Sequence, residues 1–332
     1  MKSLDLGRYA LSIDAAAALL AGCGSSQPPI GVPGATPQIP AIATHVDHGS
    51  SRMAPQAKGE DLLYVTRESV VAVYSYPRGT LEGLLTRFSY SLGDCVDKNG
   101  KIYITDYTEN TIAEYAHGGT QPIKTLSVPG SGPVACAVDP ASGDLAVTSA
   151  GNSSGGANLA VYSKAKGTPK TYTDPAILNY GYCTYDNAGN LFVDGSPAQG
   201  HGYDYELARL PRGGNSLQAV TIQYGLSWGA GLQWDGHYLA IGQPVVPHIL
   251  RYTISGGYGT YAGSTPLSGA YDAFQFIIAG KKAIVANLYY YDRYITRWDV
   301  LVFKYPAGGS DTQEILASDT PVGSVALSRR RK

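Results

Sequence analysis

Residues 95–106 read CVDKNGKIYITD, and residues 111–115 read TIAEY. Asn99 and Gly100 form an Asn-Gly pair between two short stretches rich in β-favouring residues, which is a strong signal for a tight β-hairpin. The block therefore predicts three short antiparallel strands joined by turns.

The same plan recurs along the chain, so the sequence contains an internal repeat. Further copies of the hairpin start at Cys136, Cys183, Leu232 and Phe276, and an incomplete copy starts directly with its second strand at Leu62. Neighbouring centres of the second strands lie 39 to 48 residues apart, a spacing typical of four-stranded propeller blades. These centres are Leu63, Ile102, Leu145, Leu191, Leu239 and Ile284.

The third strand of the repeat gives an independent register. Each copy places an apolar residue three positions before an aromatic residue or Leu, with glycine soon after. The six pairs are Val71 and Tyr74, Ile112 and Tyr115, Leu159 and Tyr162, Leu207 and Leu210, Ile249 and Tyr252, and Val300 and Phe303. Six copies predict an all-β fold, a six-bladed β-propeller of four-stranded antiparallel blades.

The two ends of the repeat array complement each other. The first copy lacks its innermost strand, while residues 321–328 read PVGSVALS and look like one more first strand. We therefore expect this C-terminal strand to complete blade one and to close the ring, which pairs the edges that an open array would expose. An open solenoid is the alternative, but neither end resembles a capping repeat.

The block from Asp97 to Tyr115 resembles an NHL-type repeat, and the whole array resembles the NHL, gluconolactonase-like and YncE-like bacterial propellers. The resemblance in architecture covers residues 60–328, and the motif is close only in blades two to four. It implies the closed propeller fold. It selects no function, because propellers serve as lactonases, lyases, sensors and plain binding modules.

The composition agrees with an all-β fold and narrows the range of partners. The chain has 41 Gly, 20 Pro and 26 Tyr but only 15% charged residues, which suits many short strands joined by turns. Its 25 basic and 26 acidic residues give a net charge of −1, so no whole-molecule field attracts nucleic acid. The only basic cluster, Arg329 to Lys332, is expected to be a solvated end.

The N-terminus resembles the signal peptide of a bacterial lipoprotein. Lys2 and Arg8 precede a small apolar stretch at 15–20, and residues 20–23 read LAGC, which resembles a lipobox. The resemblance implies that residues 1–22 are removed and that Cys23 becomes the acylated first residue, which attaches the exported chain to a membrane through lipid.

Some features of this end leave alternatives open. Asp14 lies within the apolar stretch and departs from the pattern, so a soluble segment at residues 1–22 is the alternative to a signal peptide. Gly24 follows the cysteine where Asp would favour the inner membrane, which favours the outer membrane or cell surface in an organism with two membranes. Residues 23–59 are rich in Pro, Gly and Ser and predict a flexible tether. Residues 60–328 remain for the propeller, and residues 329–332 form a basic tail.

The predicted binding surface is the face of the ring that carries the loops between second and third strands and the connections between blades. We call it the loop face. Its predicted loops are 106–110, 150–158, 195–203, 243–247 and 288–297.

Because tyrosine offers an apolar ring with a polar tip, we predict a non-catalytic module there for a glycan, peptide or protein, with no cofactor. Packing of these rings between blades is the alternative. The candidate ligand-binding residues are His201, Tyr203, Tyr224, Trp228, Tyr271, Tyr290 and Arg293.

A lactonase-like or lyase-like enzyme is the alternative function. Polar residues of blades four and five could meet in an acid/base or metal site, with a divalent cation in the lactonase case. Spacing alone assigns no catalytic residue, and the sequence contains no nucleophile-elbow, zinc-protease or phosphate-loop motif. The residues in question are His201, Asp204, Glu206, His237 and His248.

Cys95, Cys136 and Cys183 take equivalent places in three consecutive first strands when the repeats are aligned. This regularity favours small, buried and unreactive thiols near the axis of the ring. A metal site of three thiolates and a disulfide are the alternatives, and a disulfide needs Cα atoms within about 7 Å of each other.

Overall fold

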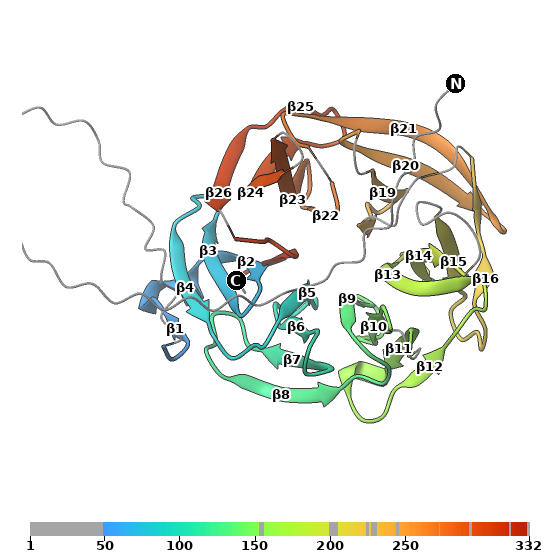
Figure 1. Ribbon diagram of the computed structural model, residues 1–332, viewed down its shortest axis with the longest axis horizontal. Helices are drawn as coiled ribbons and strands as arrows, with labels where there is room; N and C mark the ends of the chain where they lie inside the picture. The colour runs from blue at the N-terminus through green and yellow to red at the C-terminus, as the bar shows by residue number, and fades with distance from the viewer. Residues whose placement is uncertain are drawn as a thin grey trace, which may run out of the picture. The chain divides into compact units, whose positions relative to one another are not determined.

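A computed structural model of the chain describes residues 49–152, 156–198, 205–223, 226, 231–243, 246–271, 273–291, 294–318 and 320–330. Within the compact unit His48–Lys332, six sheets stand side by side in a ring (Figure 1). The predicted all-β, six-bladed propeller is therefore confirmed. Each blade has four antiparallel strands, and blades one and five carry additional outer strands.

The strands of each blade are given from the axis outward. Blade one contains β27 (Val325–Ser328), β2 (Asp61–Arg67), β3 (Val70–Tyr76), β4 (Leu81–Leu85) and β1 (Arg52–Met53). Blade two contains β5 (Ser91–Val96), β6 (Ile102–Asp106), β7 (Thr111–Tyr115) and β8 (Pro122–Ser127). Blade three contains β9 (Pro133–Val138), β10 (Leu145–Ser149), β11 (Asn158–Tyr162) and β12 (Lys170–Tyr172).

The other half of the ring follows the same plan. Blade four contains β13 (Ile177–Tyr185), β14 (Leu191–Pro197), β15 (Glu206–Leu210) and β16 (Gln218–Ala219). Blade five contains β18 (Leu232–Trp234), β19 (Leu239–Gln243), β20 (His248–Ser255) and β21 (Tyr258–Ser268), with β17 (Thr221–Ile222) and β25 (Gly309–Ser310) in parallel on β21. Blade six contains β22 (Gln275–Ile278), β23 (Lys282–Tyr291), β24 (Tyr294–Lys304) and β26 (Gln313–Ser318).

Two short 3-10 helices, η1 (Pro55–Gly59) and η2 (Ser163–Ala165), complete the described elements. In the described part of the chain, no helix has the length and apolar character needed to cross a membrane.

The predicted pairing between second and third strands is found in five of the six blades. In five blades the predicted centre of the second strand pairs directly with the predicted aromatic residue or Leu of the third strand. These pairs are Leu63 with Tyr74, Ile102 with Tyr115, Leu145 with Tyr162, Leu191 with Leu210, and Leu239 with Tyr252. In blade six the register differs by one residue, because Ala283 pairs with Phe303 and Ile284 with Val302.

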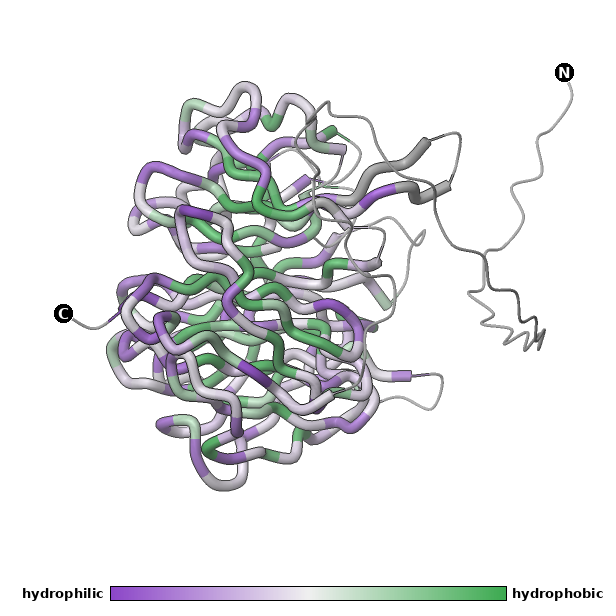
Figure 2. Tube along the Cα trace, turned by 90° about the vertical axis from the view of Figure 1, so that its left-hand side faces the viewer, coloured by the Kyte–Doolittle hydropathy of each residue, from purple (hydrophilic) through white to green (hydrophobic). Residues whose placement is uncertain are grey.

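The core consists of six hydrophobic clusters, one at each joint between neighbouring blades. Alternate residues of a strand point to opposite faces of its sheet. Leu62 and Tyr64 therefore pack against blade two, while Leu63 and Val65 pack against blade six. Figure 2 shows the hydrophobic residues gathered in the strands and the hydrophilic ones mostly at the turns.

The predicted closure of the ring is confirmed. β27 pairs antiparallel with β2, from Leu62 opposite Ser328 to Val65 opposite Val325. Val325 and Leu327 are buried at the joint between blades six and one. The innermost strand of blade one thus comes from the opposite end of the chain from its other strands.

Two segments differ from the sequence-based expectation. Residues 49–59 fell within the predicted tether, but β1 pairs with β4 and Ala57 is fully buried against blade one. Residues 288–297 were predicted as a loop, but β23 continues to Tyr291 and β24 starts at Tyr294. The β-favouring tyrosines of this segment prolong the hairpin. The rest of the predicted tether lies outside the described residues.

Candidate functional site: the loop face and the central channel

Most of the predicted site residues lie outside the described part of the chain. They are the lipid-attachment residue Cys23 and the candidate ligand-binding residues His201, Tyr203, Tyr224, Trp228 and Arg293. Tyr290 lies in β23, where its backbone pairs with Ile295, and its side chain is not among those described.

Tyr271 is the one predicted ligand-binding residue whose side chain is described. It lies in the connection from blade five to blade six, on the loop face, and 39% of its surface is exposed. Its backbone N–H donates to Oδ1 of the buried Asn287 in β23, at 2.7 Å. The residue is therefore presented to solvent from a fixed backbone.

Tyr107 is a second exposed tyrosine on the loop face and is not among the residues predicted to bind a ligand. It follows β6, is 37% exposed and meets the ring of Tyr90 edge to face at 6.1 Å. A Cβ atom at Gly132 would stand 2.5 Å from the Tyr107 ring, so the ring lies directly against that backbone. The sequence signal for Tyr107 was its position in the predicted loop 106–110.

Apolar exposure continues around the loop face. Leu178 at the start of β13 and Val246 between β19 and β20 are also exposed. The hairpin of β23 and β24 extends beyond its blade on the same face, because β23 has ten residues where β6 and β10 have five. At about 3.3 Å per residue this adds roughly 16 Å of strand.

The polar residues considered for an enzyme do not all converge. His237 lies in the turn between β18 and β19, whereas His248 begins β20 at the other end of the same blade. Glu206 begins β15 and is half-buried, and His201 and Asp204 lie outside the described residues. Among the described residues, no group of three or more His, Cys, Asp or Glu side chains is placed to hold a metal ion.

The central channel is the second candidate site. The inner strands of all six blades line a cavity of about 320 Å³. It runs from the level of Asp94 and Ser324 to the carboxyl ends of the inner strands, where Pro140, Ala279 and Arg329 lie. The turns between first and second strands surround that end, so we call this side the turn face, opposite the loop face.

Three polar side chains form a hydrogen-bonded arc on the channel wall. Ser324 Oγ donates to Asp94 Oδ1 at 2.6 Å, and the backbone N–H of Val325 donates to Gln275 Oε1 at 3.1 Å. Asp94 is 4% exposed, and burial raises its pKa to about 8. Its second oxygen, Oδ2, has no hydrogen-bond partner among the described residues.

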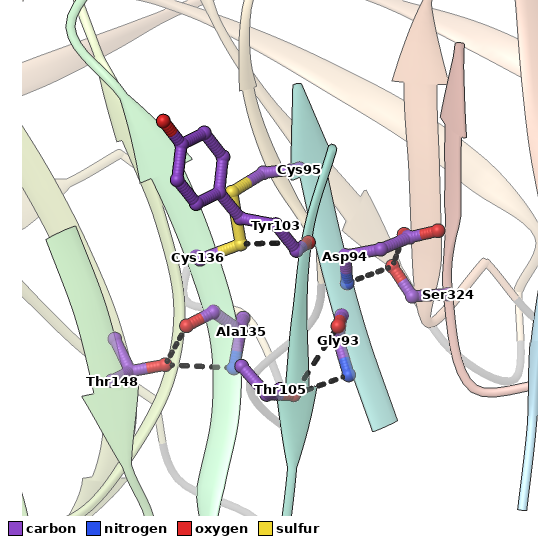
Figure 3. Close-up of a disulfide and its surroundings, with 9 residues drawn as sticks. All are labelled: Gly93, Asp94, Cys95, Tyr103, Thr105, Ala135, Cys136, Thr148 and Ser324. Atoms are coloured by element: carbon purple, nitrogen blue, oxygen red, sulfur yellow. Dashed lines mark hydrogen bonds between the residues drawn. A yellow bond between two sulfur atoms is a disulfide. The ribbon is translucent and has the colours of Figure 1, made fainter. Parts of the chain in front are cut away.

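A disulfide joins Cys95 in β5 to Cys136 in β9, with Cα atoms 5.6 Å apart (Figure 3). This corrects the expectation of three unreactive thiols and rules out a metal site of three thiolates. The cysteines are not equivalent in register. Cys136 and Cys183 pair with the third residue of the following strand, whereas Cys95 pairs with the second, Tyr103.

The one-residue offset makes the disulfide possible. A shift of one residue turns a side chain to the opposite face of its sheet. Cys136 faces blade two and Cys183 faces blade three, so each of them points to the preceding blade. Cys95 instead packs at the joint with blade three, where it meets Cys136. Equivalent cysteines would have pointed the same way around the ring.

Cys183 behaves as the sequence predicted. It is a free, buried cysteine. Burial raises the pKa of its thiol, and the nearby Asp194 raises it further. The group therefore stays protonated and is a poor nucleophile.

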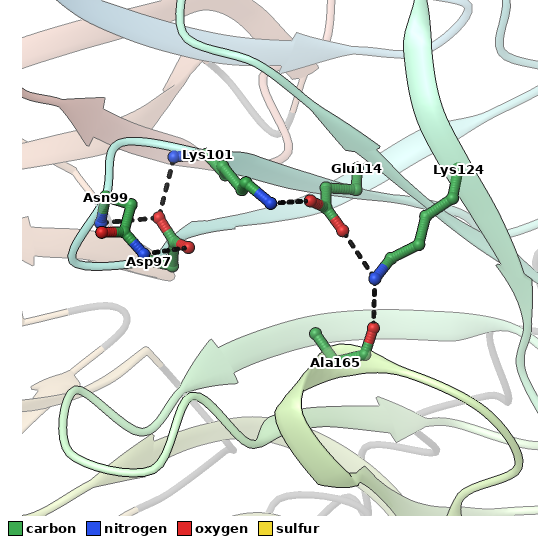
Figure 4. Close-up of polar contacts among 6 residues, drawn as sticks. All are labelled: Asp97, Asn99, Lys101, Glu114, Lys124 and Ala165. Atoms are coloured by element: carbon green, nitrogen blue, oxygen red, sulfur yellow. Dashed lines mark hydrogen bonds and ion pairs between the residues drawn. The ribbon is translucent and has the colours of Figure 1, made fainter.

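An ion-pair network stabilises the outer part of the joint between blades two and three. The buried carboxylate of Glu114 binds Lys101 Nζ at 2.6 Å and Lys124 Nζ at 2.8 Å (Figure 4). Lys124 also donates to the backbone oxygen of Ala165, the last residue of η2 in blade three. Burial raises the pKa of Glu114, but the two lysines outweigh burial and hold that pKa below its ordinary value.

Comparison with known proteins supports the fold and no narrower relationship. No protein-family model and no curated protein matches the chain. A solved nidogen/laminin complex contains a chain that is 14% identical, with a TM-score of 0.61, covering 82% of this chain and 100% of that one.

Two bacterial structures are similar in the same way. A protein of unknown function from Bacteroides caccae is 10% identical, with a TM-score of 0.60, and the match covers 81% of this chain and 99% of that one. TolB from Acinetobacter baumannii is 14% identical, with a TM-score of 0.54, and the match covers 83% of this chain and 68% of that one. At these identities the similarities establish a shared six-bladed β-propeller fold.

Proposed function

We propose that this chain is an envelope-anchored, non-catalytic propeller that binds a protein or peptide ligand on its loop face. The observation that carries the proposal is Tyr107, an exposed aromatic ring held in place by Tyr90 and Gly132. A fixed tyrosine loses little conformational entropy on binding and is a common anchor residue in interfaces. Tyr271 and the extended hairpin of blade six add contact surface on the same face.

The fold comparison is consistent with a protein ligand. The nidogen structure of similar fold was solved in complex with laminin. The disulfide between Cys95 and Cys136 supports the proposal that the chain is exported, since disulfides persist mainly in oxidising compartments outside the cytosol. Anchoring through Cys23 rests on the lipobox-like sequence alone.

Site-specific crosslinking in cells tests the binding face. A photoreactive phenylalanine replaces Tyr107 or Tyr271 in the full chain, and replaces Tyr258 in the control. Tyr258 is similarly exposed but lies on the outer strand β21. We expect a discrete protein adduct from positions 107 and 271 only. The purified partner should then bind Tyr107→Ala at least ten times more weakly than Tyr258→Ala. Adducts only at position 258, or at none of the three, would contradict the proposal.

Metabolic labelling with an alkyne fatty acid tests the anchor. The wild-type chain should carry the label, and Cys23→Ala should lose it and be released or misprocessed. Label that persists in Cys23→Ala would show that the sequence was misread as a lipobox.

A further inference from the structure

We propose that the inner end of the central cavity binds a small organic cation through a primary ammonium group, with Asp94 as its anionic partner. This site is separate from the loop face, because the cavity reaches the opposite, turn face of the ring. It therefore goes beyond the proposed function and does not depend on it.

The first observation is a buried carboxyl group with half of its hydrogen-bonding capacity unused. Asp94 lines the cavity, is 4% exposed and is the one carboxylic acid among the described lining residues. Ser324 satisfies Oδ1, while Oδ2 has no partner among the described residues. Leaving a buried acceptor unpaired costs about 1–3 kcal/mol, so a donor at this point would be favourable.

The second observation is that the wall around Asp94 is fixed and mixed in character. Ser324 Oγ accepts from the Asp94 backbone N–H at 3.3 Å while donating to its carboxylate, which holds the two residues together. Gln275 is fixed by Val325, and Tyr182 and Trp234 also line the cavity. Polar groups at one place with aromatic surface nearby are typical of small-molecule sites.

The size and charge of the cavity select the class of ligand. A volume of about 320 Å³ is at the lower end of the range for small-molecule pockets. Among the described residues that line the cavity, the other charged group is Arg329, and its Nη1 is paired with Asp61 Oδ2 at 2.9 Å. A single carboxylate is a poor site for Ca²⁺, which takes six to eight oxygen ligands. An ammonium group needs one anionic partner and donates three hydrogen bonds.

Titration of Asp94 gives the binding a predicted pH dependence. In the described part of the cavity wall, the other titratable or charged groups are Tyr182, Cys183, Tyr185 and Arg329. Burial raises the pKa of Cys183 and Tyr185, and it raises the pKa of Asp94 to about 8. Asp94 is therefore mostly ionised at pH 8.5 and mostly neutral at pH 6. Binding of a cation should weaken as the pH falls, because a proton must leave Asp94 first.

The test uses n-butylammonium chloride as probe, with n-butanol as its neutral analogue and tetramethylammonium as a cation without N–H donors. Calorimetry on the full chain compares the wild type with Asp94→Asn and Asp311→Asn. Asp311 is an exposed residue between β25 and β26, so its variant removes the same charge far from the channel.

We expect n-butylammonium to bind the wild type and Asp311→Asn with equal Kd at pH 8.5, and Asp94→Asn at least ten times more weakly. The wild-type Kd should rise at least tenfold from pH 8.5 to pH 6, and the two comparison compounds should not bind. Asn can still accept from Ser324, so we expect Asp94→Asn to fold, and its melting midpoint verifies this. Absence of n-butylammonium binding to the wild type, or equal binding to Asp94→Asn, would overturn the proposal.

Discussion

The joint between blades two and three and the closure of blade one connect the same kind of sheet by different means. Blades two and three are continuous in the chain, and the Cys95–Cys136 disulfide and the Glu114 network add to that connection. Blade one is closed by β27, whose strand arrives from the C-terminus and is held by backbone pairing, burial and hydrogen bonds. Removing a bond at the continuous joint should therefore lower the free energy of unfolding by a limited amount. Removing β27 should open the ring and destabilise the whole propeller.

β27 contacts blades two and six as well as its own blade. Ser328 Oγ donates to the backbone oxygen of Gly100 at 2.7 Å in blade two, and Ser324, the residue before the strand, donates to Asp94 in the same blade. On the other side, Val325 donates to Gln275 of blade six. The strand therefore connects three neighbouring sheets near the axis.

The largest effect should follow removal of residues 321–332. The deletion takes away the buried side chains of Val322, Val325 and Leu327, each worth about 1.5–3 kcal/mol, and exposes the edge of β2. The sum approaches the whole stability of a typical protein, about 5–15 kcal/mol. We expect loss of cooperative unfolding and aggregation, measured by calorimetry and light scattering. An unchanged melting midpoint would mean that β27 does not hold the ring closed.

Removal of the disulfide should have a smaller effect, which lowers the free energy of unfolding but leaves the fold intact. Cys95 and Cys136 are 41 residues apart in sequence, and the chain-entropy relation gives about 4 kcal/mol for a loop of this size. The double variant Cys95→Ala, Cys136→Ala should lose about this much in denaturant unfolding but remain cooperative. Cys183→Ala is the matched control, because it removes a buried free thiol, and should cost about 1 kcal/mol. Equal losses in both proteins would argue against the crosslink.

The ring closure could be predicted from the sequence, whereas the disulfide was not. The repeat spacing and the unpaired strand at 321–328 predicted the ring and its closure, because each depends on patterns local to a blade. The disulfide was missed because aligning the repeats on their cysteines hid a one-residue offset. One residue separates Cys95 from the Asp that begins the turn, whereas two residues separate Cys136 and Cys183 from theirs.

The channel site escaped prediction for a related reason. Asp94 and Ser324 are 230 residues apart and meet only because the ring closes. The sequence signal for this site was Asp94 itself, a charged residue in an inner strand, where buried residues are expected. On the loop face, the sequence predicted the kind of surface but not Tyr107, whose fixed position depends on Gly132 in the next blade connection.

The Glu114 network should contribute less than the disulfide at the same joint. In Glu114→Gln, Lys101 and Lys124 lose charge-assisted hydrogen bonds, which are worth about 1.5–3 kcal/mol each, but both lysines can turn to solvent. We expect a net loss of about 2 kcal/mol at pH 7. Glu314→Gln is the control, because its ion pair with Arg297 is exposed and should contribute less than about 1 kcal/mol.

The stability lost in Glu114→Gln should depend on pH. The folded-state pKa of Glu114 is depressed, so its stabilisation is present above the unfolded-state pKa of about 4.3. It is lost as the pH falls through the folded-state value. The difference in unfolding free energy between wild type and Glu114→Gln should therefore shrink between pH 7 and pH 3. A difference that stays constant over this range would mean that the Glu114 charge does not stabilise the joint.

The smallest effect should come from removing only residues 329–332, which lie beyond β27. Arg329 pairs with Asp61 and Arg330 donates to the same carboxylate, but these contacts are exposed. Exposed ion pairs of this kind contribute little, so we expect a change of no more than about 0.5 kcal/mol in denaturant unfolding. The closure would then depend on residues 321–328 and not on the basic residues that follow them. A loss of several kcal/mol would instead show that the tail helps to hold β27 against β2.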